Sequence, residues 1–124
     1  MSKKTILVIE DSSYLAESLV DMLEMKNFEA ITASTGRDGV ALALEKKPDL
    51  ILLDIRLPDI DGYEVYQRLQ EDTWGKTADI IVLTASESVE TISKNIDLPI
   101  EDILFKPDWS MLDLLNKITQ RVGE

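Results

Sequence analysis

The stretch Asp49-Leu50-Ile51-Leu52-Leu53-Asp54-Ile55-Arg56-Leu57-Pro58 decides the fold of this chain. Its apolar run, residues 50–53, shows no polar alternation, which predicts a strand buried on both faces, as in a parallel sheet between two layers of helices. Asp54 follows this strand directly. Ligands of open α/β sheets bind beyond the carboxyl ends of the strands. We therefore expect the chemistry of the chain to be organised around Asp54.

Strand patterns and helix patterns alternate along the whole sequence. Apolar runs predict further strands at residues 5–9, 29–33, 80–83 and 103–105, of which 29–33 is weaker and nearer to the sheet edge. Apolar residues at helical spacing predict helices at about 15–26, 37–46, 62–69, 89–96 and 112–122. The connections are too short for anything except parallel crossovers. The pattern therefore predicts an α/β fold, a doubly wound parallel sheet of five strands with five flanking helices.

The length and the first residues of the chain limit how many domains and which targeting segments it can contain. Its 124 residues contain no linker and no internal repeat, so we expect one domain over residues 1–124. The apolar run after Met1-Ser2-Lys3-Lys4 is too short for a signal peptide or a membrane span. The chain has no cysteine, which excludes disulfides and thiolate metal sites. These features predict a cytoplasmic protein without membrane contact.

Charge and the lack of histidine exclude several functions. The net charge of −11 opposes direct binding to nucleic acid, which requires a basic surface. Because the sequence has no histidine, the chain cannot act as a phosphohistidine donor, use an imidazole base or build a histidine metal site. Any phosphoryl chemistry must therefore use carboxylates, hydroxyls, lysines and a hard cation.

Polar residues of complementary chemistry follow four of the predicted strands. They are Glu10-Asp11, Asp54, Thr84 and Lys106. Each one alone is what a helix cap or a solvated turn would contain. The carboxyl ends of parallel strands share one edge of the sheet, however, so all of these side chains are expected to meet there.

The three carboxylates would repel one another unless a cation lies between them. Oxygen ligands without sulfur or imidazole favour a hard ion, and Mg²⁺ binds a few carboxylates while leaving positions for phosphate oxygens. Calcium is disfavoured, because residues 59–62 only faintly match its loop pattern and lack the later glutamate. With Mg²⁺, Asp54 could act as the nucleophile of phosphoryl transfer, and Thr84 and Lys106 could contact phosphate oxygens.

These residues, in this order, resemble the receiver domain of bacterial two-component response regulators. The resemblance rests on Glu10-Asp11, the segment 48–54, Pro58 with Gly62, Thr84-Ala85 and Lys106-Pro107. Asp11, Asp54, Thr84 and Lys106 are separated by 43, 30 and 22 residues. The resemblance covers essentially the whole chain, and it implies a flavodoxin-like sheet with the strand order 2-1-3-4-5.

The resemblance also implies a function. Asp54 would accept a phosphoryl group from a phosphohistidine of a partner kinase or phosphotransfer protein, and the chain would catalyse its own phosphorylation and dephosphorylation. Glu10, Asp11, Asp54 and the backbone carbonyl of Arg56 would hold Mg²⁺. Thr84 and Lys106 would bind the phosphoryl group. The face made by the fourth helix, fifth strand and fifth helix would then bind a downstream protein, or a second copy of a chain that is otherwise a monomer.

The sequence departs from the family in two places. Ile103 occupies the position, three residues before the lysine, where receivers commonly have a tyrosine or phenylalanine that moves with the threonine. Phe105 would point to the same side of the strand and is a possible substitute. Leu98-Pro99 replaces a pair of small residues in front of the fifth strand.

Three alternatives follow from the same residues. The first is a receiver-like interaction module that signals without phosphorylation, which would gain no mass from any phosphoryl donor. A phosphatase of the haloacid dehalogenase type is disfavoured, because its second aspartate is replaced by Arg56. A flavin-binding module is disfavoured by Glu10-Asp11, which stands where phosphate-compatible hydroxyls and glycines would be needed.

Overall fold

The computed structural model describes residues 3–85 and 87–123, and within them five parallel strands form one sheet in the order β2-β1-β3-β4-β5. The strands are β1 Thr5–Ile9, β2 Glu29–Ala33, β3 Leu50–Asp54, β4 Ile80–Thr84 and β5 Ile103–Phe105. The central strand β3 is buried along its whole length, as its unbroken apolar run predicts. The doubly wound fold and its strand order are therefore confirmed, with β2 at the edge.

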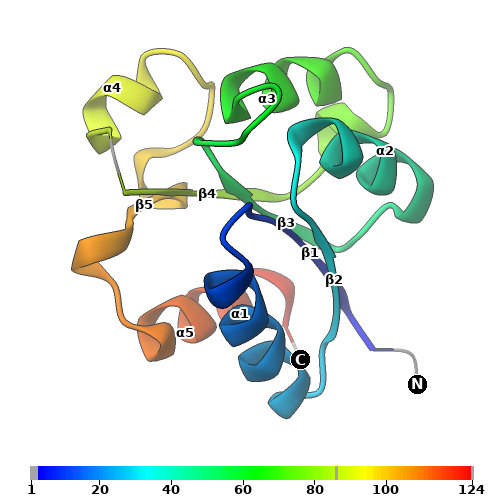
Figure 1. The fold of residues 1–124 in the computed structure, drawn as a ribbon, viewed down its shortest axis with the longest axis vertical. Helices are drawn as coiled ribbons and strands as arrows, with labels where there is room; N and C mark the ends of the chain where they lie inside the picture. The colour runs from blue at the N-terminus through cyan, green and yellow to red at the C-terminus, as the bar shows by residue number, and fades with distance from the viewer. Residues whose placement is uncertain (1–2, 86, 124) are drawn as a thin grey trace.

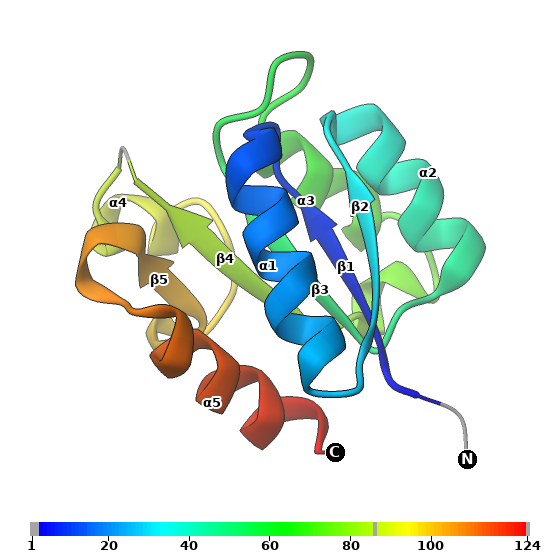
Figure 2. The ribbon, with the colours of Figure 1, turned by 60° about the horizontal axis from the view of Figure 1, so that its bottom comes forward.

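Helices cover both faces of the sheet, as Figures 1 and 2 show. The helices α2, α3 and α4 lie on one face, and α1 and α5 lie on the other. Their bounds are α1 Ser13–Met25, α2 Gly36–Lys46, α3 Gly62–Gln70, α4 Val89–Ser93 and α5 Met111–Val122. Short 3-10 turns at Gly75–Thr77 (η1), Ile100–Asp102 (η2) and Lys106–Asp108 (η3) complete the connections. No helix of the described residues has both the length and the apolar character to cross a membrane.

Alternate residues of the strands face the two layers, which gives two hydrophobic cores. Ile51 and Leu53 of β3 face the layer of α2, α3 and α4. Leu50 and Leu52 face α1 and α5. The helices contribute Ala43, Val65, Tyr66, Leu69 and Ile92 to the first core, to which the segment after α4 adds Ile96, and they contribute Leu19, Leu23, Leu114, Leu115 and Ile118 to the second.

Helix α4 is shorter than the spacing of its apolar residues predicts. It ends at Ser93, although Ile96 is still buried and its backbone N–H donates to Ile92 at 3.0 Å. The side-chain amide of Asn95 donates to the carbonyl of Thr91 at 2.9 Å. The side chain thus takes the carbonyl that the backbone N–H of Asn95 would use in a continuing helix, and this N–H donates to the carbonyl of Ile92 instead, at 2.9 Å.

An ion cluster joins α5 to the amino ends of β4 and β5. Asp102 is buried and pairs with Lys117 at 3.5 Å and with Arg121. Arg121 also reaches Asp79, just before β4, at 3.1 Å. The cluster therefore fixes α5 at the edge of the sheet opposite to the carboxyl ends of the strands.

The register of the strands places the polar residues at the ends of β1 and β3 next to each other. Ile9 pairs with Leu53, and Asp54 pairs with Leu83. Glu10 and Asp11 follow β1 directly, and Ser12 then caps α1 by accepting the N–H of Leu15. The strand-to-helix turn thus holds both acids beside the end of β3.

Candidate functional site

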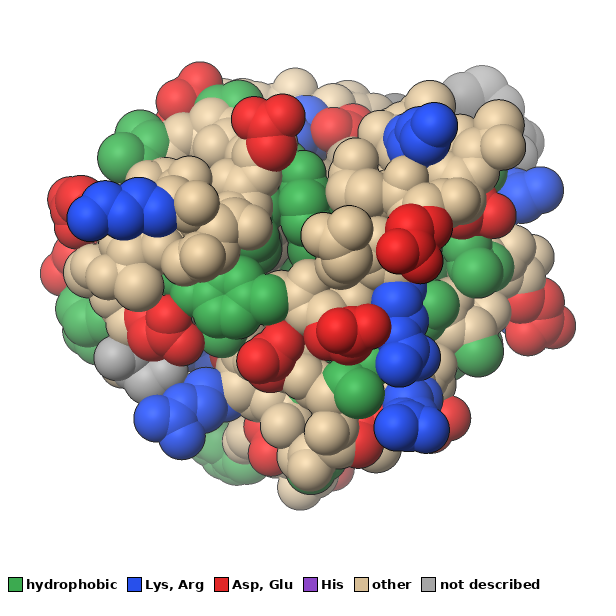
Figure 3. Space-filling model, turned by 90° about the horizontal axis from the view of Figure 1, so that it is seen from above, with side chains coloured by type: hydrophobic (Ala, Val, Ile, Leu, Met, Phe, Trp, Pro, Cys, Tyr) green, Lys and Arg blue, Asp and Glu red, His purple; other side chains and the backbone are tan. Residues whose placement is uncertain are grey.

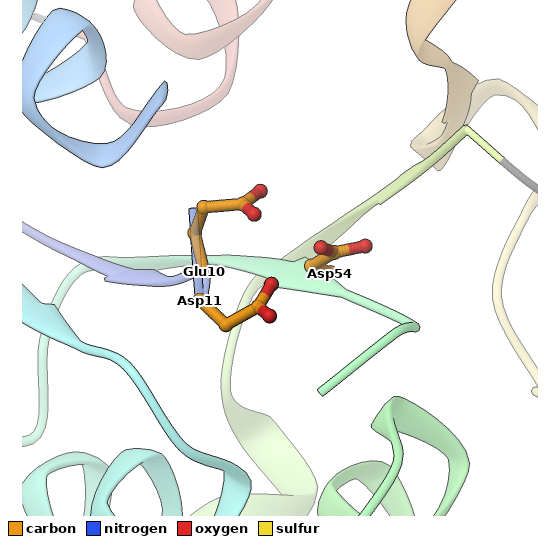
Figure 4. Close-up of side chains that lie close together, drawn as sticks. All are labelled: Glu10, Asp11 and Asp54. Carbon is orange, nitrogen blue, oxygen red and sulfur yellow. The ribbon is translucent and has the colours of Figure 1, made fainter. Parts of the chain in front are cut away.

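Three carboxylates converge at the carboxyl edge of the sheet. Glu10 and Asp11 come from the end of β1 and Asp54 from the end of β3, and Figure 4 shows their side chains around a common space. One oxygen of each lies within 4.8 Å of the others. Glu10 and Asp54 are only 4% and 5% exposed, whereas Asp11 is open to solvent. The group is therefore anchored in the sheet on one side and accessible on the other.

Lys106 supplies the positive charge of the site. It follows β5 directly, and its Nζ lies 2.8 Å from Oε1 of Glu10 and 3.5 Å from Oδ2 of Asp54. Its side chain is 23% exposed, so the ammonium sits at the mouth of the acidic group rather than inside the core. It offsets part of the repulsion between the two buried carboxylates.

Backbone donors fix the orientation of both buried acids. The N–H of Ser12 donates to Oε2 of Glu10 at 3.2 Å, and the N–H of Arg56 donates to Oδ1 of Asp54 at 3.3 Å. Asp54 therefore keeps Oδ1 on the backbone and turns Oδ2 toward Lys106. Such anchoring presents one oxygen of the carboxylate to an incoming group.

Burial and the neighbouring charge of Glu10 raise the pKa of Asp54 from 3.8 to about 6. Removal from water is the largest cause, and the carboxylate of Glu10 adds to it, while Lys106 and the N–H of Arg56 act in the opposite direction. The acids thus repel one another more than Lys106 can compensate. A bound divalent cation would relieve this repulsion.

Hydrogen bonds fix the loop between β3 and α3 at its end and join it to the start of α2. The N–H of Gly62 donates to the carbonyl of Ile55 at 2.8 Å, and a Cβ at Gly62 would lie 2.7 Å from the carbonyl oxygen of Asp54. Asp59 accepts the N–H groups of Gly36 and Arg37 at 2.7 and 3.0 Å at the start of α2. Although partial desolvation opposes it, this set of backbone donors lowers the pKa of Asp59 to about 2.

The donor set of the site fits a magnesium ion. It consists of carboxylate oxygens close together, two of them buried and one exposed, without nitrogen or sulfur ligands. Mg²⁺ prefers such oxygens and keeps other positions for water or phosphate oxygens. Glu10, Asp11 and Asp54 are the residues that could hold it.

Comparison with known proteins identifies the family. The profile of the response regulator receiver domain matches residues 6–119. The chain belongs to this family. In two-component systems, receiver domains are the phosphorylation-activated part of response regulators, interact with histidine kinases and downstream effectors, and bind Mg²⁺ in the active site.

Curated relatives of this receiver domain include two transcriptional regulators. The phosphate regulon regulatory protein PhoB of Pseudomonas aeruginosa is 34% identical over 99% of the chain, and HprR of Escherichia coli is 36% identical over 96%. The chain covers 55% and 52% of these proteins, so it spans about half the length of the curated relatives.

Solved structures agree with this assignment. A receiver domain from Methanospirillum hungatei has a TM-score of 0.81 at 27% identity, and the match covers 98% of this chain and 94% of that one. The receiver domain of a sensor histidine kinase from P. aeruginosa has a TM-score of 0.85 at 26% identity, with 99% and 100% coverage. The latter has a magnesium ion coordinated in its active-site cleft.

The predicted site residues of this receiver domain lie as follows. Glu10, Asp11, Asp54 and Lys106 come together. The backbone of Arg56 lies beside Asp54 through its N–H, while its side chain is exposed. Thr84 is fully buried at the end of β4, and its hydroxyl is bonded to the backbone of Glu87.

Two further residues were missed by the sequence reasoning. The hydroxyl of Tyr63 donates to the carboxylate of Glu87, so α3 is joined to the loop between β4 and α4. Nothing in the sequence pairs Tyr63 with an acid 24 residues later. The departure at Ile103 holds in the structure, where this side chain is buried and apolar in the core beneath α4.

Proposed function

We propose that residues 1–124 act as one receiver domain in which Asp54 accepts a phosphoryl group from a phosphohistidine of a partner protein. The observation that carries the proposal is the position of Asp54, buried at the carboxyl edge of the sheet with Lys106 at 3.5 Å and two further acids beside it. Phosphoryl transfer depends mainly on such positioning and charge stabilisation.

In the proposed reaction, a carboxylate oxygen of Asp54 attacks phosphorus while the bond from phosphorus to the imidazole nitrogen breaks. The electron pair of that bond leaves with the imidazole, and an acyl phosphate forms on Asp54. Mg²⁺ held by Glu10, Asp11, Asp54 and the carbonyl of Arg56 would neutralise phosphate oxygens. Lys106 is positioned to exchange its contact with Asp54 for a phosphate oxygen, and Thr84 would donate its hydroxyl to another. Hydrolysis of the acyl phosphate would reset the domain.

We further propose that the output face is formed by α4, β5 and α5 and binds a downstream protein. Figure 3 looks onto the layer of α2, α3 and α4, where acidic and basic side chains are interspersed over much of the visible face. The net charge of −11 supports a protein partner rather than direct contact with nucleic acid.

Intact mass measurement after incubation with acetyl phosphate and Mg²⁺ tests the proposal. The wild-type chain is expected to gain one phosphoryl group, and Asp54→Asn to gain none. Asp21→Asn, which changes an exposed aspartate of α1 outside the site, should gain as much as the wild type. If the wild type gains no mass from acetyl phosphate or from a phosphorylated kinase, the chain is instead a receiver-like module that works without phosphorylation.

A further inference from the structure

The hydroxyl of Thr84 is committed to the loop that follows it. It donates to the carbonyl of Glu87 at 3.2 Å and accepts the N–H of Glu87 at 3.1 Å. A threonine hydroxyl has a single O–H to donate. Thr84 can therefore donate to a phosphate oxygen only after its O–H has released the carbonyl of Glu87.

The side chain of Glu87 is bonded to a residue of α3. The carboxylate of Glu87 accepts the hydroxyl of Tyr63 at 2.5 Å, and both side chains are half-buried. They meet in a cleft between α3 and α4 that is also lined by Asp61 and Asn95. Desolvation and the carboxylate of Glu87 raise the pKa of Tyr63 to about 12, so the phenol stays protonated and remains a donor at neutral pH.

These contacts form one chain from α3 to the candidate phosphoryl site. Once the O–H of Thr84 turns toward Asp54, the carbonyl of Glu87 loses its donor, which favours a shift of the loop that gives this carbonyl another partner. Movement of the loop in turn stretches or breaks the bond between Glu87 and Tyr63. A contact made more strongly in one state than in the other shifts the equilibrium toward that state.

We propose that Tyr63 is a positioning residue that holds the β4–α4 loop, through Glu87, in the arrangement in which the O–H of Thr84 is bonded to the carbonyl of Glu87. This inference rests on the proposed function of Asp54 as phosphoacceptor. Tyr63, which lies in α3, would then replace the aromatic residue that receivers commonly have in β5 and that moves with the threonine. At the β5 position, Ile103 is 3% exposed and carries no polar atom that could tie down the loop.

Phe105 does not offer the same coupling. It is half-buried and lines a groove with Glu87 and Val89, so it touches the region of the loop through apolar surface only. A phenyl ring has no donor for the carboxylate of Glu87. The directional bond that distinguishes two loop positions therefore comes from Tyr63.

Titration with beryllofluoride in the presence of Mg²⁺ tests the proposal, because this ion mimics the phosphoryl group on Asp54 without requiring turnover. Tyr63→Phe keeps the ring and removes the hydroxyl. It is expected to bind beryllofluoride about three- to tenfold more tightly than the wild type, as the loss of one hydrogen bond from the resting state implies. Glu87→Gln should shift the affinity in the same direction by a smaller factor, because a neutral acceptor weakens the bond.

Tyr66→Phe is the matched control. Tyr66 lies in the same helix, and its hydroxyl donates to the carbonyl of Asp97 at 3.2 Å, in the segment after α4 and away from Thr84. Its removal should leave the affinity for beryllofluoride within twofold of the wild type. Urea denaturation of each variant establishes that all of them are folded before the titrations are compared.

The double variant Tyr63→Phe with Glu87→Gln should bind no more tightly than Tyr63→Phe alone, because both changes act on the same contact. The proposal is overturned if Tyr63→Phe matches the wild type and Tyr66→Phe, or if it binds more weakly. In that case a wild type that still binds beryllofluoride and gains a phosphoryl group leaves the function of Asp54 intact. A wild type that does neither overturns the proposed function itself, and the role of Tyr63 with it.

Discussion

Lys106 and Glu10, which are 96 residues apart in the sequence, are joined by a hydrogen bond of 2.8 Å between Nζ and Oε1. Lys106 is closer to Glu10 than to Asp54, at 3.5 Å. The lysine thus shares its charge between an acid proposed to hold the metal and the acid proposed to be phosphorylated. A cation bound by Glu10 would compete with the ammonium for the same carboxylate and free Lys106 for a phosphate oxygen.

This competition predicts opposite effects of one substitution on two ligands. Lys106→Met removes the ammonium and leaves a side chain of similar length, so Mg²⁺ should bind about three- to tenfold more tightly, a range that allows for screening of a partly exposed charge. Beryllofluoride should bind more weakly, because its contact with Lys106 is lost. Calorimetric titration measures both. Lys26→Met, at the exposed end of α1, should change neither affinity, and weaker Mg²⁺ binding by Lys106→Met would contradict the competition.

The raised pKa of Asp54 predicts that its charge destabilises the folded chain at neutral pH. The folded state holds this proton up to pH about 6, whereas an ordinary aspartate loses it near 3.8. The folded state therefore binds more protons in this window, and the contribution of Asp54 to stability falls as the pH rises from about 4 to about 6. Asp54→Asn should accordingly raise the free energy of unfolding at pH 7 by up to about 3 kcal/mol.

Urea denaturation in EDTA at pH 4 and pH 7 checks this prediction. The advantage of Asp54→Asn should be present at pH 7 and small at pH 4, where the carboxyl is protonated in both states. Added Mg²⁺ should reduce the advantage, because a cation stabilises the charged form of Asp54. An advantage of equal size at both pH values would show that the asparagine acts through packing and not through charge.

Gly62→Ala is expected to disturb the site and the fold together. A Cβ at this position would lie 2.7 Å from the carbonyl oxygen of Asp54 and 2.7 Å from Cα of Ile55, and backbone atoms cannot yield as a side chain can. We expect a loss of about 1–3 kcal/mol of stability and weaker Mg²⁺ binding. At Gly39 the same methyl would meet the side chain of Ile9, and there the loss of stability should not be accompanied by an equal loss of Mg²⁺ affinity.

The buried ion cluster predicts a variant that changes stability without changing the site. Asp102→Asn leaves Lys117 and Arg121 without their buried counter-charge and should cost about 2–4 kcal/mol. Phosphoryl gain from acetyl phosphate should be unchanged while the protein is folded, because the cluster lies at the opposite edge of the sheet. Asp79→Asn breaks a pair whose carboxylate is 48% exposed and should cost less than about 1 kcal/mol. Equal losses from the two variants, measured by urea denaturation, would contradict this account.

The sequence alone predicted the fold and most of the candidate site. The apolar run at 50–53 and the alternation of strand and helix patterns are local properties, and burial on both faces leaves few other arrangements. Parallel strands bring their carboxyl ends to one edge whatever the details of packing. For this reason Glu10, Asp11, Asp54 and Lys106 could be placed together from their positions after strands.

Only the tertiary structure decided where the hydroxyl of Thr84 points, that Glu87 is tied to Tyr63, and that Lys106 favours Glu10 over Asp54. The tertiary structure also decided where α4 ends and that the pKa of Asp54 is raised. Each depends on rotamers, burial and charges contributed by segments far apart in the chain. Periodicity reports which face of an element is buried, but it does not report which atoms meet there, because those distances are set by the packing of the whole domain.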